Sequence, residues 1–129
     1  MPLLYTHIRF ANKCIDLLQN EYKEIIKNNY LFFLYGALGP NILNYHSPFT
    51  NKKYNELSDT IHNNQIVNTL NTIKEEFKDY KNRDLVLAYS FGYLSHYVLD
   101  SYTKSYLINS SNIIKNDINS LKNEIEIQR

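Results

Sequence analysis

The stretch Asp84–Leu107, DLVLAYSFGYLSHYVLDSYTKSYL, decides the fold. Its apolar residues are spread over most faces of a helix, whereas a surface helix carries them on one face. Only three Gly and three Pro interrupt the whole chain. The segment therefore predicts a central helix that is surrounded by other helices.

Apolar residues recur at helical spacing in the rest of the chain, and sustained period-two alternation is absent. Breaks are predicted at Gly39-Pro40, at Ser47-Pro48, and at the pairs Asn28-Asn29 and Asn63-Asn64. We expect an all-α fold, a single helical bundle of five or six helices that occupies residues 1–129 as one domain. The apolar stripes are Ala11, Cys14, Ile15, Leu18, Tyr22, Ile25 and Ile26; Ile66, Leu70, Ile73 and Phe77; and Ile114, Ile118, Leu121 and Ile125.

The composition is that of an ordinary globular protein. Hydrophobic residues make up 43% of the 129 residues and charged residues 21%, and the formal net charge is +1. A nucleic-acid partner is not expected, because it would need a clustered basic excess. The 12 Tyr and 6 Phe are interpreted as filling between helices rather than as a stacking platform for single-stranded RNA.

Compartment and membrane association follow from three local features. Cys14 is the only cysteine, so no disulfide forms within the chain, and its helical stripe predicts a buried thiol. The segment 1–10 lacks the basic start and apolar core of a secretory signal. The longest apolar run, Tyr30–Leu38, is too short to span a bilayer, which takes roughly 20 residues. We expect a cytoplasmic protein without a membrane span.

Four segments in order resemble the zinc-dependent phospholipase C family. They are Met1-Pro2 with Thr6-His7, the turn Leu34–Ile42, Ile61-His62 at the start of a helix, and the helix Ala88–Ser101. The resemblance covers nearly the whole chain and implies a bundle like the phospholipase C and P1 nuclease core. Members of that family use a cluster of zinc ions, held by histidines and carboxylates, to hydrolyse the phosphodiester of phospholipids.

The resemblance assigns metal-ligand positions to His62, His96 and Asp100, and a further one to His7. Residues four apart share one face of a helix, so His96 and Asp100 can converge on one ion. With His62 they form a set of two histidines and one carboxylate, which suffices for a single zinc. The alternatives are that His96 and Asp100 form a hydrogen-bonded pair on a helix surface, and that His7 packs on a neighbouring helix.

Several other family ligands are replaced in this chain. Asn41 stands where relatives carry an aspartate that contacts zinc and is a proposed general base, and an amide accepts no proton at neutral pH. Lys104 and Ser120 stand near the positions of two histidines of another metal, where Glu124 is the one retained ligand. A protonated ammonium group has no lone pair for zinc. We expect one zinc at most and no full zinc cluster.

Lys104 has two interpretations. It follows Asp100 by four residues, in the favourable order for a helical ion pair, and could supply charge to Asp100 and Glu124 in place of the lost metal. The alternative is that Lys104 points to solvent and pairs with nothing important.

These features predict a degenerate phospholipase C-like protein, a pseudoenzyme that acts by binding a protein partner as an inhibitor or adaptor. The alternative is a reduced single-zinc phosphodiesterase or phospholipase, with a phospholipid as its substrate. A chelator separates the two, because metal binding is linked to folding.

Overall fold

The computed structural model describes the backbone of residues 4–45 and 52–127, and their side chains except at positions 45, 121 and 123–127. Within these ranges the chain forms helices and no strand, which confirms the all-α prediction. The elements are α1 (Leu4–Ile15), α2 (Asn20–Asn28), α3 (Tyr30–Leu38), the 3-10 helix η1 (Gly39–Tyr45), α4 (Lys52–His62), α5 (Ile66–Glu76) and α6 (Arg83–Ile127).

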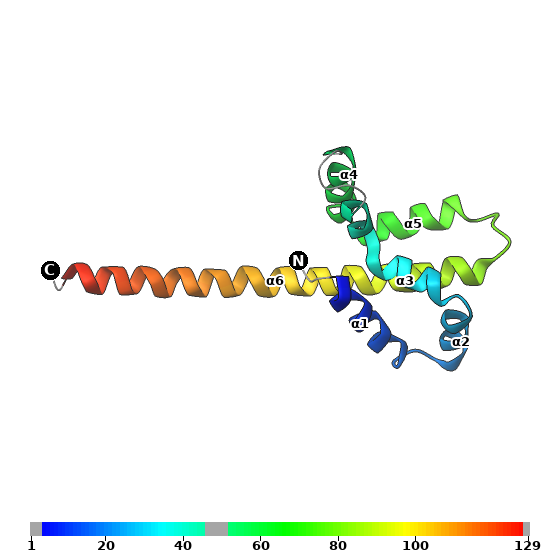
Figure 1. Cartoon of the computed structure of the whole chain (residues 1–129), viewed down its shortest axis with the longest axis horizontal. Coiled ribbons are helices and arrows are strands. Elements are labelled where there is room, and N and C mark those ends of the chain that lie inside the picture. The colour runs from blue at the N-terminus through cyan, green and yellow to red at the C-terminus, as the bar shows by residue number, and fades with distance from the viewer. Residues whose placement is uncertain (1–3, 46–51, 128–129) are drawn as a thin grey trace.

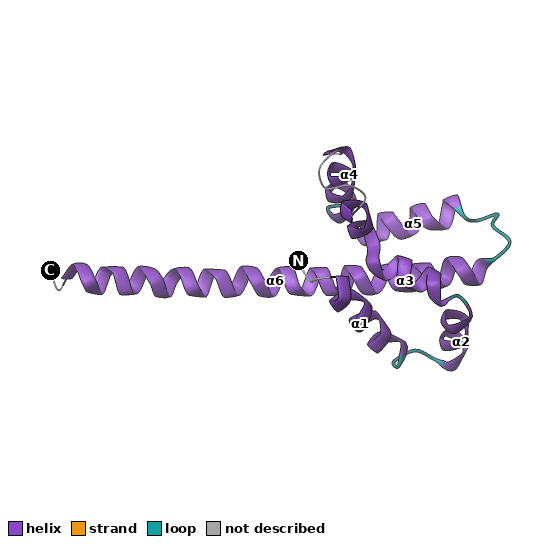
Figure 2. Ribbon diagram, viewed as in Figure 1, coloured by secondary structure: helices purple, strands orange, loops and turns teal. Residues whose placement is uncertain are grey.

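The long helix α6 organises the molecule. Figure 1 shows α6 as a straight rod, with the shorter helices gathered along its N-terminal half and its C-terminal half projecting alone. The connections between the helices are short, as the teal segments of Figure 2 show. The prediction of a central, surrounded helix therefore holds only for the first part of 84–107. Tyr102, Tyr106 and Leu107 are exposed.

Two of the apolar stripes do not correspond to separate helices. The stripe from Ile114 to Ile125 is not a separate helix but the end of α6, because no glycine or proline lies between it and Leu107 to break the backbone hydrogen bonding. The stripe from Ala11 to Ile26 is divided between α1 and α2. The N–H groups of Leu17 and Leu18 donate to carbonyls three residues earlier, which closes a tight turn after α1.

The predicted breaks at the two asparagine pairs are confirmed. Asn28 ends α2 and Asn29 separates it from α3, and Asn63-Asn64 lies between α4 and α5. Gly39-Pro40 ends α3 and opens η1, also as predicted. The Ser47-Pro48 break and the Met1-Pro2 opening lie outside the described residues.

The core lies where α1, α2 and α3 meet the N-terminal half of α6. Three of its residues are alanines without any exposure, which lets the helix backbones approach closely. Four further apolar residues, partly buried, pack around this group. The buried members are Ala11, Ile26, Phe33, Ala37 and Ala88, and the surrounding ones are Ile15, Leu18, Leu34 and Phe91.

Helices α3 and α6 approach each other closely at Gly36 and Gly92. A Cβ atom at Gly36 would overlap the carbonyl oxygen of Tyr89, and a Cβ atom at Gly92 would overlap that of Phe33. The two glycines therefore face each other's helices, and each makes room for a backbone carbonyl. This contact fixes the register of α3 along the axis of α6, and it thereby fixes the position of the turn that follows α3.

The aromatic residues, Cys14 and the absence of a membrane span were also subjects of sequence expectations. Phe33 and Tyr93 fill the interior as predicted, but many tyrosines, including Tyr5, lie on the surface. Cys14 is only partly buried, and burial raises the pKa of its thiol. In the part of the chain that the structure describes, no helix has the length and apolar character needed to cross a membrane.

Candidate metal centre

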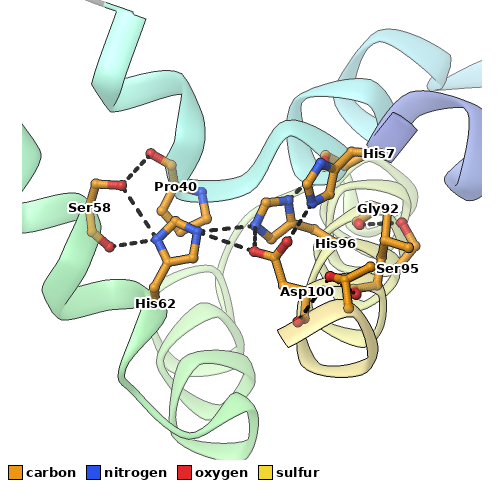
Figure 3. A network of polar contacts seen from close by, with 11 residues as sticks. His7, Pro40, Ser58, His62, Gly92, Ser95, His96 and Asp100 are labelled. Carbon is orange, nitrogen blue, oxygen red and sulfur yellow. Dashed lines mark hydrogen bonds and ion pairs between the residues drawn. The ribbon is translucent and has the colours of Figure 1, made fainter. Parts of the chain in front are cut away.

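Four titratable side chains from three helices meet on one side of α6. His7 comes from α1, His62 from the last residue of α4, and His96 and Asp100 from successive turns of α6 (Figure 3). His62 was expected at the start of a helix and lies at the end of one. His7 and His96 are almost fully buried, and their rings stack with centroids 4.3 Å apart. The site is thus built into the bundle rather than onto its surface.

Three of these side chains form a triangle of ligand atoms. His62 Nε2 lies 3.4 Å from His96 Nε2 and 3.4 Å from Asp100 Oδ2, and His96 Nε2 lies 3.1 Å from the same oxygen. Zinc bonds nitrogen and oxygen at about 2.0–2.1 Å in a tetrahedral shell, which separates neighbouring ligand atoms by about 3.3 Å. The triangle therefore has the dimensions of three ligands around one zinc.

Backbone carbonyls fix the tautomers of the two histidines. His96 Nδ1 lies 3.0 Å from the carbonyl oxygen of Ala37, and His62 Nδ1 lies 2.8 Å from that of Ser58. Because a carbonyl oxygen only accepts, each Nδ1 carries the proton and donates it. In the neutral imidazoles the lone pairs are then on the Nε2 atoms, which face each other and Asp100. This is how metal-binding histidines are usually held.

Asp100 is the charged member of the group and is held as a carboxylate. Burial opposes its ionisation, but the hydrogen bond from His7 stabilises the charged form more strongly, so the pKa of Asp100 lies well below its ordinary value. Its Oδ1 accepts a hydrogen bond of 2.8 Å from His7 Nε2. Its Oδ2 is buried and accepts no hydrogen bond from any described residue. A buried, unsatisfied carboxylate oxygen beside two lone pairs favours a cation at this place.

Two different triads can be drawn from the four residues. His7, His96 and Asp100 each offer a ligand atom within 4.8 Å of the others. The triad of His62, His96 and Asp100 is tighter, with all three separations between 3.1 and 3.4 Å. The contact of His7 with Asp100 has the length of a hydrogen bond. We therefore assign His62, His96 and Asp100 as the candidate ligands, and His7 as the residue that orients the carboxylate.

The turn after α3 closes one side of the site. Gly39 has a φ of 54°, a backbone conformation that favours glycine, and a Cβ atom there would lie 2.7 Å from the imidazole of His96. Pro40 accepts a hydrogen bond of 3.1 Å from the hydroxyl of the buried Ser58. Asn41 follows in η1, buried, and its Oδ1 has no hydrogen-bond partner among the described residues.

Ser58 and the carbonyl of Ala37 are parts of the site that sequence reasoning missed. Ser58 precedes His62 by one helical turn, and its carbonyl and hydroxyl both face the His62 ring. A serine four residues before a predicted ligand is a weak signal, since the spacing is common in any helix. The role of Ala37 depends on its backbone alone and leaves no trace in the residue type.

The structure does not bring the other predicted positions to the site. Ser120 and Glu124 lie 20 and 24 residues beyond Asp100 in the same unbroken helix, a distance of roughly 30 Å or more at 1.5 Å per residue. The structure therefore does not place Glu124 beside His62, His96 and Asp100, although the resemblance had implied a further metal ligand at this position.

Lys104 is exposed, and it forms no ion pair with any side chain that the structure describes. Asp100 is instead contacted by three histidines. This geometry favours the interpretation in which Lys104 points to solvent over the one in which it replaces a metal charge.

The fold and the site together define a helical bundle with a buried cluster of histidines and a carboxylate that could hold a metal ion. A sequence model of the zinc-dependent phospholipase C family matches residues 6–123, and the chain belongs to this family. A search of curated proteins and a search of solved structures each gave no significant match.

Proposed function

We propose that this chain is a non-catalytic member of its family, which holds one zinc on His62, His96 and Asp100 and acts by binding a partner. The observation that carries the zinc assignment is the triangle of two Nε2 atoms and the unsatisfied Oδ2 of Asp100, with sides of 3.1–3.4 Å. Two neutral imidazoles and one carboxylate give a net charge of −1, which suits a divalent cation.

The donor set fits zinc in number as well as in kind. Three protein ligands leave one position of a tetrahedral shell open. His62 and Asp100 are 18% and 17% exposed, so solvent has access to the site from their side. A bound zinc supplies Lewis-acid polarisation of a phosphoryl oxygen and a lowered pKa for a bound water. The protein orients the candidate ligands. The carbonyls of Ala37 and Ser58 hold the imidazoles of His96 and His62, and His7 holds the carboxylate of Asp100.

Two features support the absence of catalysis. Asn41, two residues after Gly39 in η1, carries an amide where the family's aspartate is a proposed base, and an amide cannot take a proton from an attacking water at neutral pH. Of the family's other metal-ligand positions, Ser120 and Glu124 lie about 30 Å or more along α6 from Asp100, and the nearer one holds Lys104, whose ammonium group has no lone pair for zinc. A phosphodiester at this site would therefore lack both a base and a second cation.

A second candidate is a single-zinc phosphodiesterase. The partial exposure of His62 and Asp100 favours it, because a small phosphodiester could reach an open metal position. In that case a water on the metal would have to lose its proton without the family's aspartate.

A hydrolysis assay with a chromogenic phosphodiester and added zinc distinguishes the two candidates. We expect the protein to release product no faster than its His96→Ala variant. Asn41→Asp is expected to raise zinc-dependent hydrolysis by about a hundredfold above that background, the lower range for a general base. Turnover by the unmodified protein that His96→Ala abolishes would contradict the non-catalytic proposal and establish the enzyme.

A further inference from the structure

The C-terminal half of α6 is a helix without a partner among the described residues. From Ser101 to Ser120 nearly every side chain is exposed, including Leu107, Ile114 and Ile118. In residues 108–120, eight of thirteen are Asn, Ser or Asp, which are poor helix formers. Helical stability in proteins comes mostly from packing of an apolar face. A helix of this composition therefore needs another protein surface to pack against.

The apolar residues of this half are spaced as in a coiled coil. Leu107, Ile114 and Ile118 follow one another at seven and four residues, with Ser111 between them at the intermediate position. The sequence continues the same spacing to Leu121 and Ile125. We call this row from Leu107 to Ile125 the seam. In heptad notation, position d holds Leu107, Ile114 and Leu121, and position a holds Ser111, Ile118 and Ile125. Isoleucine at a combined with leucine at d favours a parallel coiled coil of two helices.

The charges beside the seam are complementary to those of a second copy in parallel orientation. Asp117 occupies the g position before Ile118, and Lys122 the e position after Leu121. In a parallel pair, g of one helix meets the following e of its partner, so Asp117 would face Lys122 of the other copy twice in each dimer. In an antiparallel pair, g meets g and e meets e, which brings like charges together.

We propose that the C-terminal half of α6 forms a parallel two-stranded coiled coil with a second copy of this chain. This inference goes beyond the metal site and does not depend on it. The dimer covers Leu107, Ile114 and Ile118, and it places both metal centres at the same end of the paired helices. Residues 107–125 would give a seam of about 28 Å.

Sedimentation equilibrium of the full chain tests the association. We expect a particle of twice the 15.3 kDa chain mass, and loss of this dimer in Ile114→Asn at concentrations where the unmodified protein is paired. Ile113→Asn is the matched control, because Ile113 is equally exposed at 62% against 57% and has the same chemistry but lies off the seam. A monomer at every concentration, or equal losses in the two variants, would overturn the proposal.

The charges test the orientation. Asp117→Lys and Lys122→Glu should each weaken the dimer by about tenfold, since each turns two attractive pairs into repulsive ones. The double variant should restore it. Positions 117 and 122 are five apart and do not face each other within one helix, so restoration cannot be an effect inside one chain. A double variant that stays as weak as the single ones would refute the parallel arrangement.

Discussion

Gly92→Ala is expected to lower the free energy of unfolding by about 3 kcal/mol or more, which is the upper end of the range for adding a methyl group to a well-packed core. The added methyl group would overlap the carbonyl oxygen of Phe33, a backbone atom that cannot rotate away. Helices α3 and α6 would have to separate, which would open the core around Ala37 and Ala88. Urea unfolding followed by circular dichroism measures the change.

The intrinsic helix preference acts in the opposite direction. Alanine in place of a helical glycine stabilises an isolated helix by about 1 kcal/mol, so a loss of stability must come from the packing. Ser105→Ala, at an exposed position of the same helix, is the control and should change stability by no more than about 0.5 kcal/mol. A Gly92→Ala protein as stable as the original would show that α3 and α6 do not approach at this point.

Zinc is expected to raise the melting temperature of the metal-free protein by about 10 °C when its free concentration is a hundred times the dissociation constant. At that ratio, binding to the folded state alone adds about 2.7 kcal/mol of stability. For a chain of this size, each 1 kcal/mol moves the melting temperature by roughly 4 °C. The shift should be reversed by a chelator, because the ligands come from α4 and α6 and are brought together only by folding.

Variants of single ligands separate zinc binding from general stability. His62→Ala and Asp100→Asn should each abolish most of the zinc-induced shift, whatever they do to the melting temperature without zinc. Asp84→Asn removes an exposed acid from the same helix and should retain the full shift. If Asp84→Asn reduced the shift as much as Asp100→Asn, the stabilisation would come from zinc bound loosely at the surface.

The sequence predicts two features well, for physical reasons: the all-α fold class and the proximity of His96 and Asp100. The first part of the segment 84–107, apolar on most faces, can satisfy its backbone and bury its side chains only as an enclosed helix. His96 and Asp100 lie within one helix, so the period of 3.6 residues determines their proximity. The assignment of His62 to the same site rested on the resemblance alone, because no local rule connects α4 with α6.

The features that the sequence could not predict depend on contacts between distant segments. The fit of Gly36 and Gly92 requires the register of α3 on α6, and a glycine within a helix can have other roles. The carbonyls of Ala37 and Ser58 act independently of the side chains. The position of Glu124 depends on the course of the chain after Leu107, where asparagine and serine are compatible with either a turn or a continued helix.

The central claim is that His62, His96 and Asp100 hold one metal ion. The most direct measurement is the metal content of protein purified without added zinc or chelator, by elemental mass spectrometry, beside the His96→Ala variant prepared in the same way. One zinc per chain, lost in the variant, is the predicted result. A protein that contains no metal and takes up none when dialysed against zinc would contradict it, and the triangle would then be a hydrogen-bonded cluster around Asp100.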